Sequence, residues 1–218
     1  MLKTKPILIE EMTKGNQDKV TEIWARFLDG DKESFAEIYN LFIDDLFRYG
    51  TKLSQDEELV KDAIQEVFMD LYVNRKSKKE LDSNLKFWLI LALKRNLIRK
   101  LQKSRKNENR IILDSDLFET QYNFEEQLIR EEAHSEVFEK VRNAMEKLPP
   151  KQKEAIYLRY NQSLEYEQIA GMLEISVESV RKQVYRAIKS IRNCFDENGV
   201  ILFSILKSRW AFSSGAFV

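Results

Sequence analysis

Apolar residues recur at steps of three and four along several stretches of the chain, which is the spacing of one buried face of an α-helix. The first of these stretches starts at Asp31, the second runs from about Gln55 to Val73, and the third starts at Leu85. The helical pattern returns at 137–148 and, after two prolines, continues at 155–160. The pattern therefore predicts helices connected by short polar segments.

Residues 163–192 have the order short helix, turn and longer helix, which is typical of a helix-turn-helix. Ser163 can cap a first helix that runs through Leu173, and Ser176 can cap the second helix. The second helix would bury a valine-rich stripe and expose a basic face. In a DNA-bound helix-turn-helix, the N-terminal part of the second helix enters the major groove.

This geometry indicates which side chains of the second helix would contact DNA. A basic amphipathic helix after another helix is also compatible with a solvated helical hairpin, but the capping and the turn spacing favour the helix-turn-helix. The candidates for contacts to base edges are Glu178, Ser179, Lys182 and Gln183, and those for phosphate contacts are Arg181, Arg186 and Lys189.

Composition supports an all-α protein, because the 218 residues include only 6 Gly and 3 Pro and are otherwise rich in good helix formers. Hydrophobic residues make up 43% and charged residues 33% of the chain, which is enough to build modest cores beneath a charged surface. The length allows two helical units of under about 100 residues each. We therefore expect two helical domains.

The formal net charge is +0, but charges of one sign are gathered in blocks. The helix predicted at 55–73 has an acidic outer face, whereas the helix that starts at Leu85 ends in a basic run that reaches Lys106. Residues from about 107 to 136 carry many acids without a strong helical period. We interpret them as an acidic linker between the two domains.

Several classes of site are disfavoured by the residues present. The single cysteine, Cys194, has no partner for an intramolecular disulfide, and the chain shows neither a signal peptide nor a membrane-spanning run, so we expect a cytoplasmic protein. The lone His134 and the adjacent acids Glu125 and Glu126 do not form a metal-binding or catalytic pattern. We expect no catalytic residues, no metal and no cofactor.

Trp88 has two interpretations. An aromatic side chain beside a basic helix can stack on an unpaired base, but the neighbouring Leu85, Leu89 and Ala92 favour a buried position. We assign Trp88 to the core.

Three strings of residues occur in an order that is informative about the family. The run 62–68 reads Asp-Ala-Ile-Gln-Glu-Val-Phe, the segment 87–96 contains Phe-Trp-Leu followed by Ala92, Arg95 and Asn96, and the segment 148–187 begins Leu-Pro-Pro-Lys-Gln and contains Ile-Ala, Ser-Val and Arg-Ala pairs. Together they resemble the extracytoplasmic-function (ECF) sigma factors of bacterial RNA polymerase. The resemblance covers nearly all of residues 31–192.

The resemblance implies a sigma factor that directs core RNA polymerase to promoters and promotes transcription initiation without catalysing a reaction. Its fold would combine a region 2 helical bundle with a region 4 helix-turn-helix that reads the −35 element. Polymerase contacts are implied for Asp62, Gln65, Glu66 and Asp70. Contacts to the melted −10 strand are implied for Arg75, Lys78, Lys79, Asn84, Lys94, Arg95, Asn96 and Arg99.

Core RNA polymerase and promoter DNA are the implied partners, and an anti-sigma factor is a further partner that the family commonly has; no membrane insertion is implied. Lys61, Gln168 and Lys100 stand at or near positions where the family usually has acids, which affects single contacts more than the assignment. The expected domain limits are an N-terminal tail at 1–25, region 2 at 26–106, the acidic linker at 107–136, region 4 at 137–196 and an apolar C-terminal tail at 197–218.

Two other classes of protein are compatible with parts of this pattern. A stand-alone helix-turn-helix regulator would account for residues 140–192 but not for the acidic helix upstream, and it would bind its operator without polymerase. A nucleic-acid-processing enzyme would need metal ligands or an acid/base pair in a cleft, and would turn over substrate when purified alone.

Overall fold

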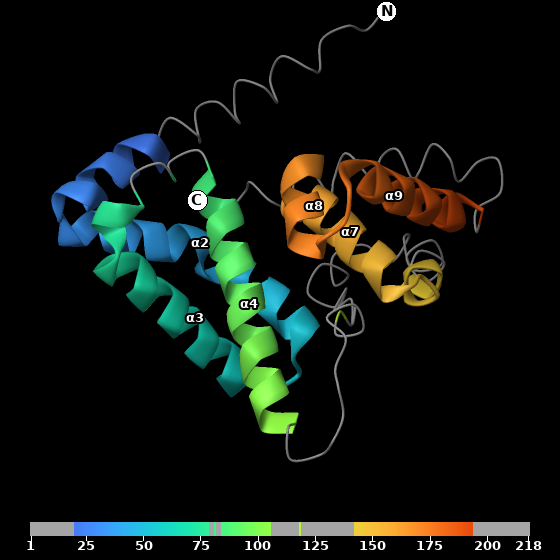
Figure 1. Ribbon diagram of the computed structural model, residues 1–218, viewed down its shortest axis with the longest axis horizontal. Coiled ribbons are helices and arrows are strands. Elements are labelled where there is room, and N and C mark those ends of the chain that lie inside the picture. Colours follow the sequence, from blue (N-terminus) through green and yellow to red (C-terminus); the bar gives the residue numbers. More distant parts are fainter. Residues whose placement is uncertain (1–19, 79–80, 82–83, 106–117, 119–141, 194–218) are drawn as a thin grey trace, which may run out of the picture. The chain divides into compact units, whose positions relative to one another are not determined.

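The computed structural model describes residues 20–78, 81, 84–105, 118 and 142–193, and the regular structure in these ranges is helical throughout (Figure 1). The chain divides into two compact units, Met1–Ser104 and Arg105–Val218. The predicted all-α class is confirmed. Within these ranges, none of the helices is both long and apolar enough to cross a membrane.

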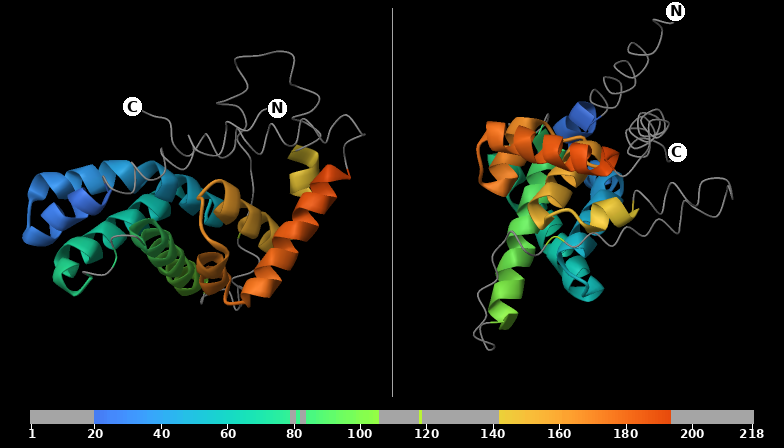
Figure 2. Two further views of the ribbon diagram at one scale, coloured as in Figure 1. Left: turned by 90° about the horizontal axis from the view of Figure 1, so that it is seen from above. Right: turned by 90° about the vertical axis from the view of Figure 1, so that its right-hand side faces the viewer.

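The N-terminal unit is built from helices that begin where the sequence predicts. Asp31 caps the helix that begins at Lys32 by accepting hydrogen bonds from the backbone N–H groups of Glu33 and Ser34. Asp56 caps the helix that begins at Glu57 by accepting a hydrogen bond from the backbone N–H of Leu59. The elements, seen from two further sides in Figure 2, are a helix at 20–29, α2 (Lys32–Leu53), α3 (Glu57–Val73), the 3-10 helix η1 (Arg75–Ser77) and α4 (Leu85–Arg105).

The apolar stripes of α2, α3 and α4 form the core of this unit. Aromatic rings of α2 and α3 meet in it: the ring of Phe35 lies edge-on to those of Phe68 and Tyr72, with centroids 6.3 and 5.1 Å apart. The buried residues that the three stripes contribute include Ile38, Phe42, Leu46, Ala63, Ile64, Val67, Phe68, Leu71, Leu85, Leu89, Leu93 and Leu97.

The helix at 20–29 belongs to this core, although part of it falls in the predicted N-terminal tail at 1–25. Ile23 and Trp24 are buried, and the ring of Phe27 lies against those of Trp24 and Phe35. The sequence pattern missed this helix because only one turn and a half of apolar residues precedes the break at Gly30 and Asp31.

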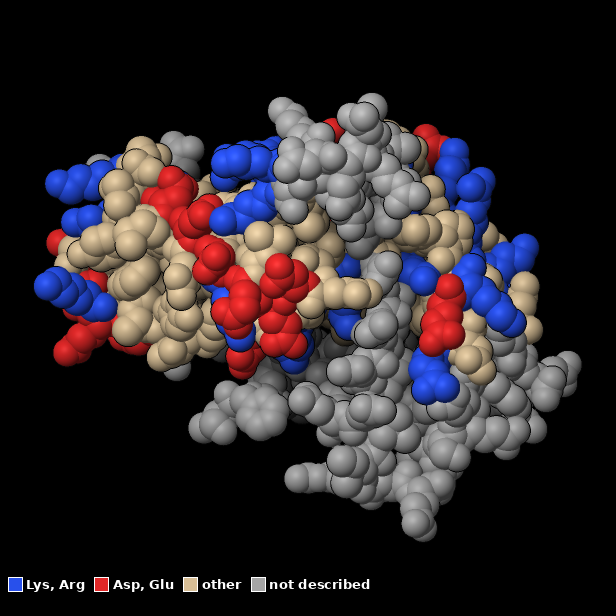
Figure 3. Space-filling model, turned by 90° about the horizontal axis from the view of Figure 1, so that it is seen from below, with Lys and Arg blue, Asp and Glu red and all other residues tan. Residues whose placement is uncertain are grey.

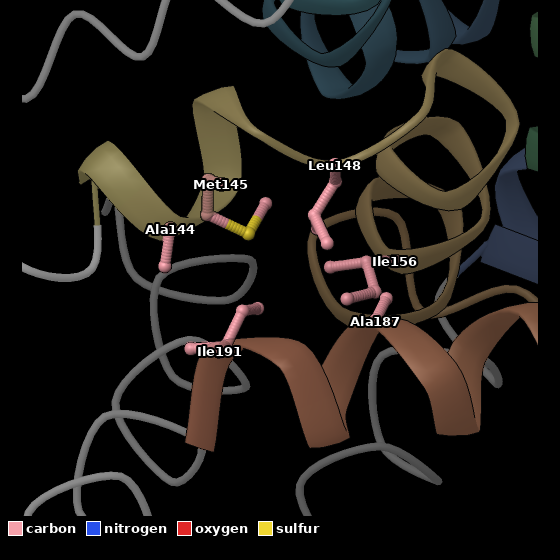
Figure 4. Close-up of a cluster of buried hydrophobic side chains, with 6 residues drawn as sticks. All are labelled: Ala144, Met145, Leu148, Ile156, Ala187 and Ile191. Atoms are coloured by element: carbon pink, nitrogen blue, oxygen red, sulfur yellow. The ribbon is translucent and has the colours of Figure 1, made fainter. Parts of the chain in front are cut away.

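The C-terminal unit has a short helical segment at 142–146 followed by α7 (Pro150–Tyr160), α8 (Tyr166–Leu173) and α9 (Val177–Arg192). Pro150 occupies the first helical position of α7, where its missing N–H has no cost. Figure 4 shows side chains from the segment before α7, from α7 and from α9 meeting in one apolar cluster, made of Ala144, Met145, Leu148, Ile156, Ala187 and Ile191.

One residue of the predicted acidic linker, Phe118, is part of this unit's core. Its side chain is only 2% exposed, and its ring centroid lies 5.6 Å from that of Tyr157 in α7. The other residues of the linker lie outside the described ranges, as does the apolar tail at 197–218.

Candidate nucleic-acid interface

The helix-turn-helix predicted at 163–192 is formed by α8, a tight turn at residues 174–176 and α9. Glu174 makes the turn with a left-handed backbone, φ 52° and ψ 42°. Ser176 caps α9, as predicted, by accepting a 3.2 Å hydrogen bond from the backbone N–H of Ser179. The two helices pack on α7, so the turn is held on a small apolar core.

The predicted cap of α8 is wrong. Ser163 has a left-handed backbone, φ 56°, and lies before the helix, while Glu165 is the N-cap. Glu165 and Gln168 form a reciprocal capping box, in which the backbone N–H of Glu165 donates a 2.9 Å hydrogen bond to Oε1 of Gln168. Gln168 therefore has a structural role at the position where the family usually carries an acid.

The buried and exposed faces of α9 are those expected of a recognition helix. Val180, Val184, Ala187 and Ile191 are buried. On the opposite side, five of the predicted DNA contacts are exposed and two, Ser179 and Gln183, are half-buried; the exposed five are Glu178, Arg181, Lys182, Arg186 and Lys189.

Several of these side chains have neighbours within the unit. Lys182 Nζ lies 2.6 Å from the Glu178 carboxylate, one helical turn away. Arg181 lies over the ring of Tyr166 in α8, 5.5 Å from its centroid. Exposed ion pairs of this kind contribute little, typically about 0–1 kcal/mol, so they are easily exchanged for contacts to DNA.

Tyr185 also lies on the exposed face of α9 and was missed in the sequence analysis. Its side chain is 65% exposed, although tyrosine is usually at least partly buried. The signal was available, because Tyr185 follows the inward-facing Val184 and sits one turn beyond Arg181 and Lys182.

The predicted polymerase-binding residues all lie on the exposed side of α3, since Asp62, Gln65, Glu66 and Asp70 are exposed. Figure 3 shows acidic side chains gathered in a row across the face of the N-terminal unit that carries α3, with basic side chains beside them. Two apolar side chains interrupt this row: Met69 and Val73 are 63% and 65% exposed. They were missed because both fit the general helical pattern of apolar residues.

Glu66 connects α3 with α4. Its carboxylate accepts a 2.7 Å hydrogen bond from Lys100 Nζ and a 2.8 Å hydrogen bond from Asn96 Nδ2. The bonds from Lys100 and Asn96 stabilise the ionised carboxylate and lower the pKa of Glu66 below its ordinary value.

Asp70 makes a similar pair of contacts one turn later. Lys78 Nζ lies 2.5 Å from one carboxylate oxygen and Asn74 Nδ2 lies 2.6 Å from the other. Desolvation of Asp70 acts to raise its pKa, but the hydrogen bonds from Lys78 and Asn74 outweigh it and lower the pKa.

The predicted −10 contacts on α4 differ in accessibility. Arg95 and Arg99, one turn apart, are exposed. Lys94 is only 3% exposed and Asn96 only 8%, so the expectation that both lie open to DNA is wrong for this conformation. Residues 94 and 96 flank the buried positions of Leu93 and Leu97 on the helix surface, and the amide of Asn96 is held by Glu66 of α3.

The remaining −10 candidates come before α4. Arg75 is half-buried: its guanidinium lies over the ring of Tyr72 and donates a hydrogen bond to the backbone carbonyl of the same residue. Asn84 is exposed. Lys79 lies outside the described residues.

Trp88 is half-buried rather than part of the core, which corrects its assignment. Lys78 Nζ lies 4.3 Å from the centroid of the indole, a cation–π distance. Because Lys78 also binds Asp70, one lysine connects the acidic row of α3 to the aromatic ring of α4.

The described residues contain no group of three or more His, Cys, Asp or Glu side chains that could hold a metal ion. His134, Cys194 and the pair Glu125 and Glu126 lie outside the described ranges.

Comparisons with known proteins agree with this arrangement. Residues 138–191 match the family model described as sigma-70, region 4. The chain is 25% identical over 161 residues to the ECF RNA polymerase sigma factor SigM of Bacillus subtilis (strain 168), covering 73% of this chain and 94% of SigM. It is 27% identical over 173 residues to the ECF RNA polymerase sigma factor SigW of the same organism, covering 75% of this chain and 89% of SigW.

A similar fold is found in the sigma factor RpoE from Bartonella quintana, solved in complex with the anti-sigma factor NepR. That chain is 20% identical, with a TM-score of 0.51, and the match covers 74% of this chain and 96% of RpoE. The region 4 match contains α7, α8 and α9 with their exposed basic face, and the two curated relatives extend the similarity over most of the chain. The chain is therefore similar to the ECF RNA polymerase sigma factors over most of its length, and its C-terminal unit matches region 4 of sigma-70.

Proposed function

We propose that this sigma factor divides promoter recognition between its two units, and that α9 reads the −35 element. The observation that carries the proposal is the exposed basic face of α9, which lies opposite the buried valine stripe of the same helix. α9 follows the turn of the helix-turn-helix and lies within the region 4 match. In a helix-turn-helix that face enters the major groove. Base contacts are assigned to Glu178, Ser179, Lys182 and Gln183, and phosphate contacts to Arg181, Arg186 and Lys189.

The N-terminal unit is proposed to bind core polymerase through the exposed row of α3 and the melted −10 strand through the neighbouring basic residues. The polymerase contacts are Asp62, Gln65, Glu66 and Asp70. The −10 contacts are Arg75, Lys78, Lys79, Asn84, Arg95, Asn96 and Arg99. Lys94 is left out because it is buried, whereas Asn96 is kept because its amide donates a hydrogen bond to Glu66, which is itself exposed.

Unpairing a −10 base costs a few kcal/mol, which stacking and phosphate contacts must recover. Arg95 and Arg99 are suited to hold phosphates, since both are exposed and one turn apart. The half-buried indole of Trp88 is the only tryptophan next to these residues in the described part of the chain and offers a stacking surface.

The proposal carries three further consequences. The domain limits expected from the sequence, with region 2 at 26–106 and region 4 at 137–196, are retained. The protein acts without catalytic residues of its own, because the polymerase supplies the chemistry. Since bacterial promoters and polymerase lie in the cytoplasm, the protein acts there.

An anti-sigma factor is proposed as a regulatory partner. RpoE of Bartonella quintana was solved in complex with the anti-sigma factor NepR. The exposed Met69 and Val73, which lie within the acidic row of α3, offer apolar anchors of the kind that protein interfaces use.

The decisive experiment mixes the purified full-length chain with core RNA polymerase that lacks any sigma subunit. Co-elution and new, promoter-dependent transcripts from genomic fragments are expected. Binding of specific DNA by the chain alone, without association with polymerase, would instead indicate a stand-alone regulator.

A further inference from the structure

Two carboxylates of the N-terminal unit, both proposed polymerase contacts, already accept hydrogen bonds from basic or amide side chains of the same unit. These donors lie among or beside the proposed −10 contacts. Glu66 binds Asn96 and Lys100, and Asp70 binds Lys78. Asn96 and Lys78 are both among the proposed −10 contacts, and Lys100 lies one turn from Asn96 on the same basic helix.

These contacts use the donors that a DNA strand would need. A carboxylate oxygen and a phosphate oxygen compete for the same ammonium or amide hydrogen atoms. The donors are also partly enclosed, since the side chains of Lys78 and Lys100 are 14% and 23% exposed. An approaching phosphate therefore has to displace a carboxylate before it can form a full contact.

Lys78 also covers a surface on which a base could stack. Its Nζ atom lies 4.3 Å from the centroid of Trp88 while it is held 2.5 Å from Asp70. As long as Asp70 holds Lys78 in this place, one face of the indole is occupied by the ammonium group.

From this pattern we propose that Glu66 and Asp70 mask part of the −10 surface in the free chain, and that polymerase unmasks it by taking over these two carboxylates. The inference rests on the proposed function, because it uses the proposed polymerase contacts on α3. A basic partner on polymerase would replace Lys78, Lys100 and Asn96 as ligands of the carboxylates. The released side chains would then be free for DNA.

The size of the effect follows from the exposure of the pairs. Both carboxylates are about half exposed, so each pair is weak and the mask is partial. Removing both carboxylates is expected to strengthen binding of single-stranded DNA to the free chain by about 5-fold. It also adds two lysines to the phosphate contacts, which steepens the slope of log affinity against log salt by about 0.7 for each.

The test uses the free full-length chain and a fluorescein-labelled, random-sequence single-stranded oligonucleotide, titrated at several salt concentrations. The variant Glu66→Ala/Asp70→Ala is compared with Asp29→Ala/Asp44→Ala, which removes the same charge from exposed sites on the helix at 20–29 and on α2. Tighter binding and a steeper slope in the first variant alone support masking. Equal affinities and slopes in the two variants overturn it.

Circular dichroism checks whether each variant is folded. A second, more conservative double variant is used if the alanine variant unfolds. Glu66→Gln/Asp70→Asn keeps hydrogen-bond acceptors but removes both ion pairs with lysine, so its slope should steepen in the same direction relative to Asp29→Asn/Asp44→Asn. A slope that does not differ from that control would also overturn masking.

Release is tested with holoenzyme, assembled at saturating polymerase, and the melted strand of a promoter found in the transcription experiment. Wild type and Glu66→Ala/Asp70→Ala are expected to bind this strand equally, because polymerase has already unmasked the wild type. A 5-fold advantage of the variant that persists in the holoenzyme would overturn the release step. A wild-type chain that does not bind polymerase at all would overturn the proposed function. Masking would still be judged from the salt slopes measured with the free chain.

Discussion

Gly50 illustrates how a single residue sets the distance between two helices. It lies inside α2, where glycine is unfavourable for helix formation, yet a Cβ atom built on it would lie 2.5 Å from Cγ1 of Val60 in α3. Val60 is completely buried, so its methyl group has no space into which to move. The close approach of α2 and α3 therefore depends on the missing side chain.

Gly50→Ala is expected to destabilise the protein. Overpacking of a filled core costs about 1–3 kcal/mol, and the better helix propensity of alanine returns at most about 1 kcal/mol. Urea unfolding followed by circular dichroism measures the difference. In a double-mutant cycle, Val60→Ala should partly relieve the cost, so the two substitutions should be less than additive. A more stable Gly50→Ala variant would contradict the close approach.

The turn between α8 and α9 shows a similar constraint on the scale of an element. Glu174 has the left-handed backbone that usually belongs to glycine or asparagine at the end of a helix, and its side chain is exposed. A residue with a Cβ atom pays about 1–2 kcal/mol for this conformation. The angle between the two helices depends on this turn.

Glu174→Gly is expected to stabilise the C-terminal unit by up to about 1 kcal/mol, because the strain is relieved at a smaller cost in the entropy of the unfolded chain. Thermal unfolding measures the change. The matched control is Glu178→Gly in the first turn of α9, where the same substitution falls in regular helix and should be destabilising. If Glu174→Gly were the more damaging of the two, the turn would not be strained.

The exposed face of α9 supports a distinction between two kinds of DNA contact. Lys182→Ala is expected to weaken binding to the cognate −35 sequence by about 1–3 kcal/mol and to affect other sequences less, because it is assigned to base edges. Arg186→Ala should weaken binding to all sequences and reduce the salt slope by about 0.9, because it is assigned to a phosphate.

Both variants are measured in holoenzyme on cognate and scrambled −35 duplexes. Lys147→Ala, an exposed lysine before α7, is the control and should change neither quantity. A Lys182 variant that lost affinity for both duplexes equally would reassign Lys182 to the phosphate backbone.

On the scale of the whole molecule, we propose different tasks for the two units. Acidic and apolar side chains line α3 in the N-terminal unit, whereas basic ones line α9 in the C-terminal unit. Surfaces built on separate cores should respond independently to substitution, since sites without shared contacts are usually additive.

Asp62→Lys is therefore expected to weaken binding to core polymerase by 10-fold or more, on the order of 1.4 kcal/mol, by placing a cation in the acidic row. Lys182→Ala should leave polymerase binding unchanged. Fluorescence anisotropy with labelled chain and core polymerase measures both. Asp44→Lys makes the same change of charge on α2 and controls for net charge. An equal loss of affinity for core polymerase in this variant would rule out a specific role of Asp62.

Much of this protein was already determined by local patterns in its sequence. The starts of α2, α3 and α9 follow from Asp31, Asp56 and Ser176, because a capping side chain acts on backbone groups only two or three residues away. The buried stripe of α9 and its basic face follow from the 3.6-residue period. The similarity to ECF sigma factors could be predicted because its motifs are short strings in a fixed order.

Tertiary structure decided the contacts between residues that are distant in sequence. Asn96 and Glu66 are 30 residues apart, and their hydrogen bond depends on the packing of α4 against α3. Tertiary structure also places Lys78 over Trp88, leaves Met69 and Val73 exposed, and leaves Lys94 only 3% exposed. The helical period determines on which face of a helix a side chain lies. The neighbouring helix determines whether that face is exposed to solvent or a partner, or contacts another side chain.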